Sequence, residues 1–297
     1  MKEAQFYEQL DDDKVRCRLC PHNCLIYPGR VGICFVRQNI AGKLYSLSYG
    51  RISAQHLDPI EKKPLFEFYP GSQIFSVSSI GCSLACPYCQ NWELAHPKSR
   101  FFKEDPETVI EKTTSKLTPR QAVDTALNYK KMNNIGIAYT FNEPLIWYEY
   151  LSDTAKIATE NGLKNVVVTN GYLNPEPLME ILPFIDAVNI DIKGFNDNVY
   201  KRLGGKLKPV LESAALLNTS CHVEVTNLLV PEMNTDEEEI RSLVNWIADN
   251  LGSDTPLHFS RYFPSHKMNV PPTPISVLEK ARQLGEERLK HVYLGNV

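Results

Sequence analysis

Residues 73–89 of this chain read QIFSVSSIGCSLACPYC, an apolar and β-branched run followed directly by three closely spaced cysteines. The run over 73–80 predicts a buried β-strand, and the cysteines fall on the loop after it. Three such thiolates can each hold one iron of a cubane iron–sulfur cluster, which leaves the fourth iron without a protein ligand. The pattern therefore predicts a [4Fe–4S] cluster with one open coordination position, held by Cys82, Cys86 and Cys89. A three-thiolate zinc site is the alternative, but structural zinc normally takes four ligands and nothing in this loop completes the set.

Strands and helices alternate through the rest of the chain. Apolar or β-branched runs predict strands at 73–80, 135–141, 165–169, 187–193, 222–230 and 256–263. Helical patterns occur at 119–131, 147–161, 175–182, 236–250 and 275–289. Parallel strands joined by helices predict an α/β fold, and six units without a two-plus-four break favour a partial (β/α)6 TIM-like barrel over residues 73–297. A flat doubly wound sheet is the alternative.

The first 50 residues are polar, loop-rich and unusually rich in cysteine. They lack a periodic stretch long enough for a core, so we expect a small metal-stapled N-terminal segment, joined by a connector over 51–72. Its four candidate ligands are Cys17, Cys20, Cys24 and Cys34. Their spacing suits a zinc knuckle, which we favour, and equally a second iron–sulfur cluster. His22 is interpreted as a bystander because four thiolates already suffice.

Composition excludes several classes of function. The net charge of -3 argues against a nucleic-acid partner, because phosphate binding requires clustered excess Lys and Arg. The N-terminus lacks a signal pattern and no apolar run is long enough to span a bilayer, so we expect a cytoplasmic protein without a membrane partner. That compartment is reducing, which favours metal ligands over disulfides. The run Glu61-Lys62-Lys63 is expected to be a solvated edge. Residues 93–118 predict either a lid over the site or a surface excursion.

Polar side chains follow several of the predicted strands. In barrels the active site lies at the carboxyl ends of the strands, where the cysteine loop also starts. The candidates there are Asn142, Glu143, Thr169, Asn170, Asp191, Lys193 and Arg261. Glu143 could instead start the next helix, and Asp191 with Lys193 could form a purely structural ion pair. Arg261 could bind a carboxylate bidentately or form a salt bridge at the rim.

The spacing Cys-x3-Cys-x2-Cys, with Tyr88 before the last cysteine, resembles the signature of the radical S-adenosylmethionine (SAM) superfamily. The resemblance implies that SAM chelates the open iron and is cleaved reductively to methionine and a 5′-deoxyadenosyl radical. It implies that Tyr88 lies against the adenine and that Glu143, with Asn142, holds the methionine amino group. The superfamily usually has Gly-Gly-Glu where this chain has Phe141-Asn142-Glu143.

The motif Asp191-x-Lys193 resembles that of pyruvate formate-lyase activating enzymes, which implies that Thr169, Asn170, Asp191 and Lys193 contact the cofactor. Arg261 is carried as a further candidate for the carboxylate of the cofactor or of a substrate. The resemblance also implies an electron donor such as a flavodoxin or a ferredoxin.

Nearly the whole chain is similar to the radical SAM enzyme of the AmmeMemoRadiSam system, itself similar to those activating enzymes. The motifs that carry this similarity are Cys20-Pro21-His22-x-Cys24, residues 58–65, Cys89-Gln90-Asn91, Asn142-Glu143-Pro144 and residues 168–172. It implies an oxidoreductase that abstracts hydrogen from a protein or peptide, as glycyl-radical activating enzymes do. The alternatives are radical modification of a small metabolite or lipid, and a non-catalytic iron–sulfur scaffold.

Overall fold

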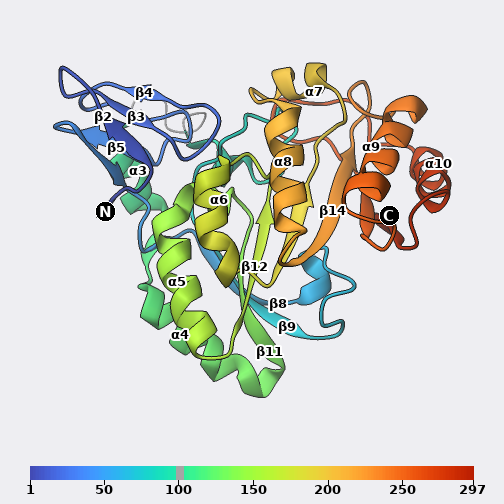
Figure 1. The fold of residues 1–297 in the computed structure, drawn as a ribbon, viewed down its shortest axis with the longest axis horizontal. Helices are drawn as coiled ribbons and strands as arrows, with labels where there is room; N and C mark the ends of the chain where they lie inside the picture. Colours follow the sequence, from blue (N-terminus) through green and yellow to red (C-terminus); the bar gives the residue numbers. More distant parts are fainter. Residues whose placement is uncertain (98–103) are drawn as a thin grey trace.

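An eight-stranded sheet forms the centre of the computed structural model, which describes residues 1–97 and 104–297 (Figure 1). Its strand order is β16-β15-β14-β13-β12-β11-β9-β8. The parallel strands are β9 (Gln73–Ser78), β11 (Asn134–Tyr139), β12 (Lys164–Thr169), β13 (Ala187–Asp191), β14 (His222–Leu229), β15 (Leu257–Arg261) and β16 (Val292–Gly295). The edge strand beside β9 is β8 (Ala54–Pro59), which pairs antiparallel with it. This strand lies in the segment that was predicted to be a connector. The predicted α/β partial barrel is confirmed, with β16 added beyond the six expected strands.

Helices cover the outer face of the sheet (Figure 1). The five predicted helices are present as α4 (Pro119–Asn128), α5 (Tyr148–Glu160), α6 (Pro175–Ile181), α9 (Glu237–Asn250) and α10 (Ile275–Glu286). Two more, α7 (Asp197–Arg202) and α8 (Leu207–Leu217), were not predicted. Short 3-10 turns follow at η2 (Tyr129–Met132), η3 (Pro144–Trp147) and η4 (Leu182–Phe184). In the described part of the chain, no helix combines the length and apolar character needed to cross a membrane.

Residues 93–118 contain more secondary structure than a loop. The short helix α1 (Trp92–Ala95) leaves the cysteine loop, α3 (Pro106–Thr113) follows, and β10 (Ser115–Lys116) pairs antiparallel with β7 (Arg51–Ile52). Asp105 caps α3 by accepting a hydrogen bond from the amide of Thr108. The part of the predicted lid that falls on residues 98–103 lies outside the described residues.

The N-terminal segment forms two small antiparallel sheets beside α3 and α5 (Figure 1). One contains β1 (Lys2–Glu3), β6 (Lys43–Ser46) and β5 (Arg37–Ile40), and the other contains β2 (Tyr7–Gln9), β3 (Val15–Cys17) and β4 (Leu25–Ile26). Arg37 and Glu149 of α5 form a fully buried ion pair with an N–O distance of 3.0 Å. Val15, Leu19 and Ile26 belong to the same hydrophobic cluster as the barrel strands. The segment therefore shares its core with the barrel.

Residues 60–68, which we call the plug, fill the barrel interior near the amino ends of the strands. Ile60, Leu65 and Phe68 pack in one buried cluster with apolar residues from four strands, Ile74, Ala138, Val166 and Ala187. The plug begins with the 3-10 turn η1 (Ile60–Lys62).

The carboxylate of Glu224 fixes the backbone of the plug. It accepts hydrogen bonds from the amides of Phe66 (3.0 Å) and Glu67 (2.8 Å), and others from His222 and His258. Glu224 itself is fully buried on β14. The hydrogen-bonding needs of the buried Glu224 carboxylate are thus met by a segment more than a hundred residues away in the sequence.

The expected solvated edge at Glu61-Lys62-Lys63 is only partly correct. The side chain of Lys62 is 59% exposed, whereas that of Lys63 is 1% exposed. Its ammonium lies 2.7 Å from Asp58 and 4.7 Å from the centre of the Phe141 ring. The prediction was wrong for Lys63 because a buried cation needs partners that the local charge run does not reveal.

Candidate active site

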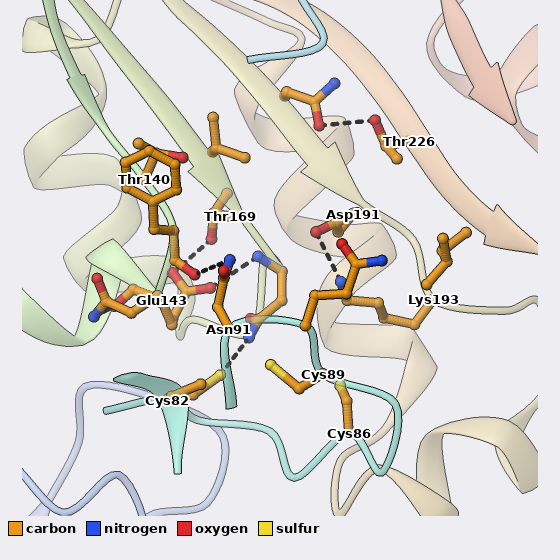
Figure 2. Close-up of a pocket in the computed structure, with 18 of the residues that line it drawn as sticks. Cys82, Cys86, Cys89, Asn91, Thr140, Glu143, Thr169, Asp191, Lys193 and Thr226 are labelled. Atoms are coloured by element: carbon orange, nitrogen blue, oxygen red, sulfur yellow. Dashed lines mark hydrogen bonds and ion pairs between the residues drawn. The ribbon is translucent and has the colours of Figure 1, made fainter. Parts of the chain in front are cut away.

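A cavity of about 340 Å³ opens at the carboxyl ends of the barrel strands. Ten of the eleven residues predicted for the barrel site line it: Cys82, Cys86, Tyr88, Cys89, Asn142, Glu143, Thr169, Asn170, Asp191 and Lys193. Figure 2 shows the cysteine side chains on one loop, facing Glu143 on one side and the Asp191–Lys193 pair on the other. The structure thus gathers groups from the loop after β9 and from the ends of β11, β12 and β13 into one place.

The cysteine loop, residues 81–91, begins with a glycine whose backbone conformation and close surroundings exclude a side chain. Gly81 has a φ of +92°, and a Cβ on it would lie 2.5 Å from the carbonyl oxygen of Cys34. The sulfur of Cys82 accepts hydrogen bonds from the amide of Leu84 (3.4 Å) and from the side chain of Asn170 (3.5 Å). Hydrogen bonds of this kind favour a thiolate over a thiol.

The donor set fits an iron–sulfur cluster. Burial raises the pKa of the Cys86 thiol to about 11, and the nearby Lys193 ammonium acts in the opposite direction. Buried thiols of this kind become thiolates when a metal centre binds them. Within residues 1–97 and 104–297, no three His, Cys, Asp or Glu side chains gather closely enough to hold a single metal ion. A cubane places each thiolate on a different iron, so its ligands surround a volume and do not converge on one point.

Glu143 is buried at the end of β11 and its carboxylate is well satisfied. It accepts hydrogen bonds from the hydroxyl of Thr169 (2.7 Å) and from the amides of Asn170 (2.8 Å) and Leu145 (2.9 Å). Burial raises the pKa of Glu143 to about 7, although these hydrogen bonds act to lower it. The residue also caps the turn η3, as expected if it starts the next helix. It lines the cavity as well, so one side chain occupies both predicted positions. Two carboxylate oxygens can accept about four hydrogen bonds, which leaves capacity for a further donor.

Asn142 and Asn91 tie the cysteine loop to the end of β11. The side chain of Asn142 accepts from the amide of Ser79 (3.0 Å) and donates to the carbonyl of Gly81 (3.2 Å). Asn91 donates to the carbonyl of Phe141 at 2.8 Å. Phe141 has a φ of +70°, a conformation that glycine adopts readily. The chain therefore keeps a glycine-like backbone where the superfamily usually has glycine.

Asp191 and Lys193 form an ion pair at the opposite wall of the cavity, with an N–O distance of 2.7 Å. Burial by itself lowers the pKa of Lys193, but Asp191 and the thiols of Cys86 and Cys89 outweigh it and raise the pKa above its ordinary value. The ammonium is therefore close enough to these two sulfur atoms to stabilise negative charge on them.

Tyr88 is 2% exposed and lines the cavity. Its hydroxyl is buried and has no hydrogen-bond partner among the described residues. The ring of Tyr262 meets it edge to face, with the centroids 6.5 Å apart. A buried aromatic ring beside the cysteines shields that wall from water.

Arg261 is the predicted barrel residue that the structure does not bring to the cavity. Its Nε donates to the carbonyl of Thr273 at 2.8 Å, and its guanidinium lies 4.9 Å from the centre of the Phe263 ring. Strand alternation explains the difference, because the neighbouring Ser260 lines the cavity instead. Among the described residues Arg261 forms no rim salt bridge, and its expected contact with the carboxylate of a cofactor or substrate stays a prediction.

Sequence reasoning missed the far wall of the cavity. Its polar groups come from β13 to β16 and from the plug: Asn189, Thr226, Ser260, Asn296 and Lys62. Two of them could have been found from strand periodicity, because Asn189 lies two residues before Asp191 and therefore on the same face. Ser260 shares the inner face with His258 in the same way. Nothing in the local sequence places Lys62 here.

The N-terminal cysteines also gather in one place. Cys17, Cys20, Cys24 and Cys34 line a small pocket together with the buried side chain of Arg37. Whether they hold zinc or a second cluster stays a prediction.

His22, interpreted as a bystander of the N-terminal metal site, makes a contact with the barrel that was not predicted. Its Nε2 lies 2.7 Å from the carbonyl oxygen of Ser83, inside the cysteine loop of the barrel. The ring also contacts Tyr172 edge to face.

A relative of known sequence covers the whole chain. It is 47% identical to protein MJ0808 of Methanocaldococcus jannaschii over all of its own length and 86% of that protein. It is 29% identical to the pyruvate formate-lyase-activating enzyme of Clostridium pasteurianum over 56% of this chain and 66% of that enzyme.

Solved structures share the fold at low sequence identity. Streptococcus suis SuiB bound to the precursor peptide SuiA has a TM-score of 0.53 and 15% identity, over 73% of this chain and 47% of that one. QueE from Escherichia coli has a TM-score of 0.50 and 12% identity, over 82% of this chain and 92% of that one. The family described as the radical SAM superfamily matches residues 76–246, more than half of the sequence. The chain therefore belongs to the radical SAM superfamily.

Proposed function

We propose that this protein holds a [4Fe–4S] cluster on Cys82, Cys86 and Cys89, binds SAM beside it, and abstracts hydrogen from a glycine of a partner protein. The observation that carries the proposal is the convergence of these cysteines, Glu143 and the Asp191–Lys193 pair on one cavity. When bound, the cluster and SAM supply one-electron cleavage to methionine and a 5′-deoxyadenosyl radical.

The cysteine loop and Lys193 stabilise the anionic thiolates. Two hydrogen bonds reach the sulfur of Cys82, and the Lys193 ammonium acts on Cys86 and Cys89. Asp191 holds Lys193 in place through their 2.7 Å contact. A cation beside the thiolates also favours the more negative, reduced state of a bound cluster.

Glu143 would receive the amino group of SAM. Its carboxylate is fixed by Thr169, Asn170 and Leu145, so it is already oriented before a ligand binds. An ammonium donor would use the remaining acceptor capacity of that carboxylate as a charge-assisted hydrogen bond. Asn142 would act by positioning the cysteine loop, since its side chain holds Ser79 and Gly81.

The far wall of the cavity suits a peptide. Asn189, Thr226, Ser260 and Asn296 present neutral amides and hydroxyls, which match the hydrogen-bonding groups of a polypeptide backbone. Similarity to a pyruvate formate-lyase-activating enzyme and to a peptide-bound radical SAM structure supports the same class of substrate. We also propose that the protein belongs to the AmmeMemoRadiSam group. Its electron donor would be a flavodoxin or a ferredoxin.

A small metabolite or lipid is the second candidate substrate. A volume of about 340 Å³ is within the usual range for small-molecule sites. One relative, the 7-carboxy-7-deazaguanine synthase of Methanocaldococcus jannaschii, is 22% identical over 58% of this chain. A non-catalytic iron–sulfur scaffold is the third candidate, and it would leave Glu143 with only its structural role as the cap of η3.

The decisive test is anaerobic incubation of the reconstituted protein with dithionite and SAM. We expect 5′-deoxyadenosine to form, and a glycyl radical signal to appear by electron paramagnetic resonance (EPR) on a co-encoded protein. Deuterium transfer into 5′-deoxyadenosine from a small molecule would instead support the second candidate. The absence of any SAM cleavage would support the scaffold.

Glu143→Gln tests the proposed contact with SAM. We expect cleavage to fall by about a hundredfold or more, because the negative charge that would hold the ammonium group is lost. An amide NH2 also replaces one of the two oxygens that accept from the amides of Leu145 and Asn170. The exposed Glu160→Gln at the end of α5 is the matched control and should cleave SAM at the wild-type rate. Equal cleavage by both variants would exclude this role for Glu143.

A further inference from the structure

The N-terminal cysteine set (Cys17, Cys20, Cys24 and Cys34) lies directly against the cysteine loop of the barrel. Cys34 and Cys82 line one shared cavity of about 180 Å³. The carbonyl oxygen of Cys34 is so close to Gly81 that a Cβ there would meet it at 2.5 Å. The two candidate metal sites are therefore neighbours in space although they are far apart in the sequence.

A hydrogen bond also joins the two sets. His22 lies between Cys20 and Cys24, and its Nε2 is 2.7 Å from the carbonyl oxygen of Ser83, the residue after Cys82. The route from Cys20 to Cys82 thus follows the covalent bonds of residues 20–22 and 82–83 and crosses this single hydrogen bond. Asn170 extends the same network, since its side chain contacts both Ser83 and the sulfur of Cys82.

The pocket of the N-terminal set is built for an anionic centre. Arg37 lines it, is 1% exposed, and has a buried Nε without a hydrogen-bond partner among the described residues. A guanidinium stays protonated in proteins, so Arg37 carries its positive charge beside the sulfur atoms of this set. An orphaned donor on a buried cation is costly unless a bound anion accepts from it. Thiolates or the sulfides of a cluster would supply that acceptor.

The set also lies between solvent and the barrel site. Ile33 lines both the pocket of the N-terminal set and the cavity that reaches Cys82, and its side chain is 56% exposed. A redox partner at the surface would therefore approach the N-terminal set across a single side chain. Zinc has no redox chemistry, so a zinc ion at this position could not pass electrons from a surface partner to the barrel site.

We propose that the N-terminal set holds a second [4Fe–4S] cluster, and that this cluster passes electrons to the one on the cysteine loop. A low-potential one-electron donor such as a reduced flavodoxin reduces the N-terminal cluster from the 2+ to the 1+ state. The electron then moves to the barrel cluster, which goes from 2+ to 1+ while the N-terminal cluster returns to 2+. No bond is formed or broken and no proton is transferred. The transfer step rests on the barrel cluster of the proposed function, whereas the presence of a second cluster does not.

Metal analysis tests the cluster itself. We expect about eight irons and eight sulfides per anaerobically reconstituted chain, and about four of each in the triple variant Cys82→Ala, Cys86→Ala, Cys89→Ala. The triple variant should still give an EPR signal of a reduced cluster with dithionite, and SAM should not change that signal. Zinc in place of iron and sulfide in this variant, or no metal at all, would overturn the proposal.

Reduction kinetics test the transfer step. Reduced flavodoxin is mixed with protein that has SAM bound, and the EPR signal of the SAM-bound barrel cluster is followed by freeze-quench. We expect the double variant Cys20→Ala, Cys24→Ala to keep about four irons and to lose the fast phase of this reduction. Cys221→Ala, a cysteine outside both sets, is the matched control and should keep that phase.

A second variant covers the case in which loss of two cysteines unfolds the segment. His22→Phe keeps an aromatic ring against Tyr172 but removes the hydrogen bond to Ser83. It should contain the wild-type amount of iron and show a slower fast phase with flavodoxin. A fast phase unchanged in both variants would overturn the transfer step. Failure of the proposed function is distinguished because it would abolish SAM cleavage with dithionite in the wild type.

Discussion

The two ends of the barrel interior carry opposite kinds of side chain. At the carboxyl end, thiols, amides and hydroxyls surround an open cavity of about 340 Å³. At the amino end, the plug fills the same interior with Ile60, Leu65 and Phe68, and Glu224 closes it with hydrogen bonds to the backbone of the plug. The inward-facing side chains of the strands thus pack against the plug at one end. At the other end they line an open cavity that can bind a ligand. We infer that stability is concentrated at the plugged end and chemistry at the open end.

The largest effect that this comparison predicts is at the open end. Cys86→Ala should abolish SAM cleavage, since one iron would lose its thiolate ligand. The metal-free form should lose about 1 kcal/mol of unfolding free energy or less, because only a small side chain is removed. Iron content, 5′-deoxyadenosine formation and urea unfolding of the metal-free protein measure these quantities. A large loss of stability would show that the open end also holds the barrel together.

The next effect is expected at the plugged end. Leu65→Ala removes a fully buried side chain from the cluster with Ile74, Ala138 and Val166. We expect a loss of about 2–5 kcal/mol in unfolding free energy, the usual range for such a substitution in a core. SAM cleavage per folded, iron-loaded molecule should stay near the wild-type value. If cleavage falls in proportion to stability, the two ends are not separable.

Both ends also show what the sequence could and could not predict. Six of the strands, β9 and β11 to β15, were located within a few residues because β-branched runs bounded by turn residues are a local signal. The cysteines, Glu143 and the Asp191–Lys193 pair follow the strands directly, so their meeting at one edge could be inferred from topology.

The plug could not be predicted in this way. Lys63 stands in a charged, proline-punctuated run that is typical of a surface loop, and its burial depends on the fold around it. Glu224 is satisfied by amides about 160 residues earlier in the chain, a contact that no local pattern reports. The helix α8 was also missed, although its one proline, Pro209, lies in the first turn, where proline is tolerated.

The pH dependence of stability tests Glu224 more finely. Burial alone would raise its pKa, but hydrogen bonds from His222, His258 and the amides of Phe66 and Glu67 lower it from 4.5 to about 2. A carboxylate with a lowered pKa stabilises the fold above its unfolded-state pKa, and this contribution is lost as the pH falls from about 4.5 toward 2. The shift corresponds to at most about 3 kcal/mol.

The measurement is the difference in unfolding free energy between wild type and Glu224→Gln, taken by urea titration at several pH values. We expect the advantage of the wild type to be constant above about pH 5 and to shrink steadily below it. The exposed Glu160→Gln should show no such dependence. A difference that is the same at all pH values would mean that Glu224 is not held as a buried carboxylate.

The last comparison is between two neighbouring lysines of the plug, and the Lys62 substitution has the smallest expected effect on stability. Lys62 and Lys63 both pair with Asp58, but Lys62 is 59% exposed and faces the cavity while Lys63 is buried. Exposed pairs contribute about 0–1 kcal/mol, whereas removing one partner of a buried pair costs about 3–5 kcal/mol. Lys62→Gln should therefore leave the urea midpoint almost unchanged, and Lys63→Gln should lower it clearly. Since Lys62 also lines the substrate side of the cavity, its variant should change the KM for the substrate more than it changes kcat. Equal losses of stability in the two variants would show that the boundary between the plugged and the open end does not run between these two residues.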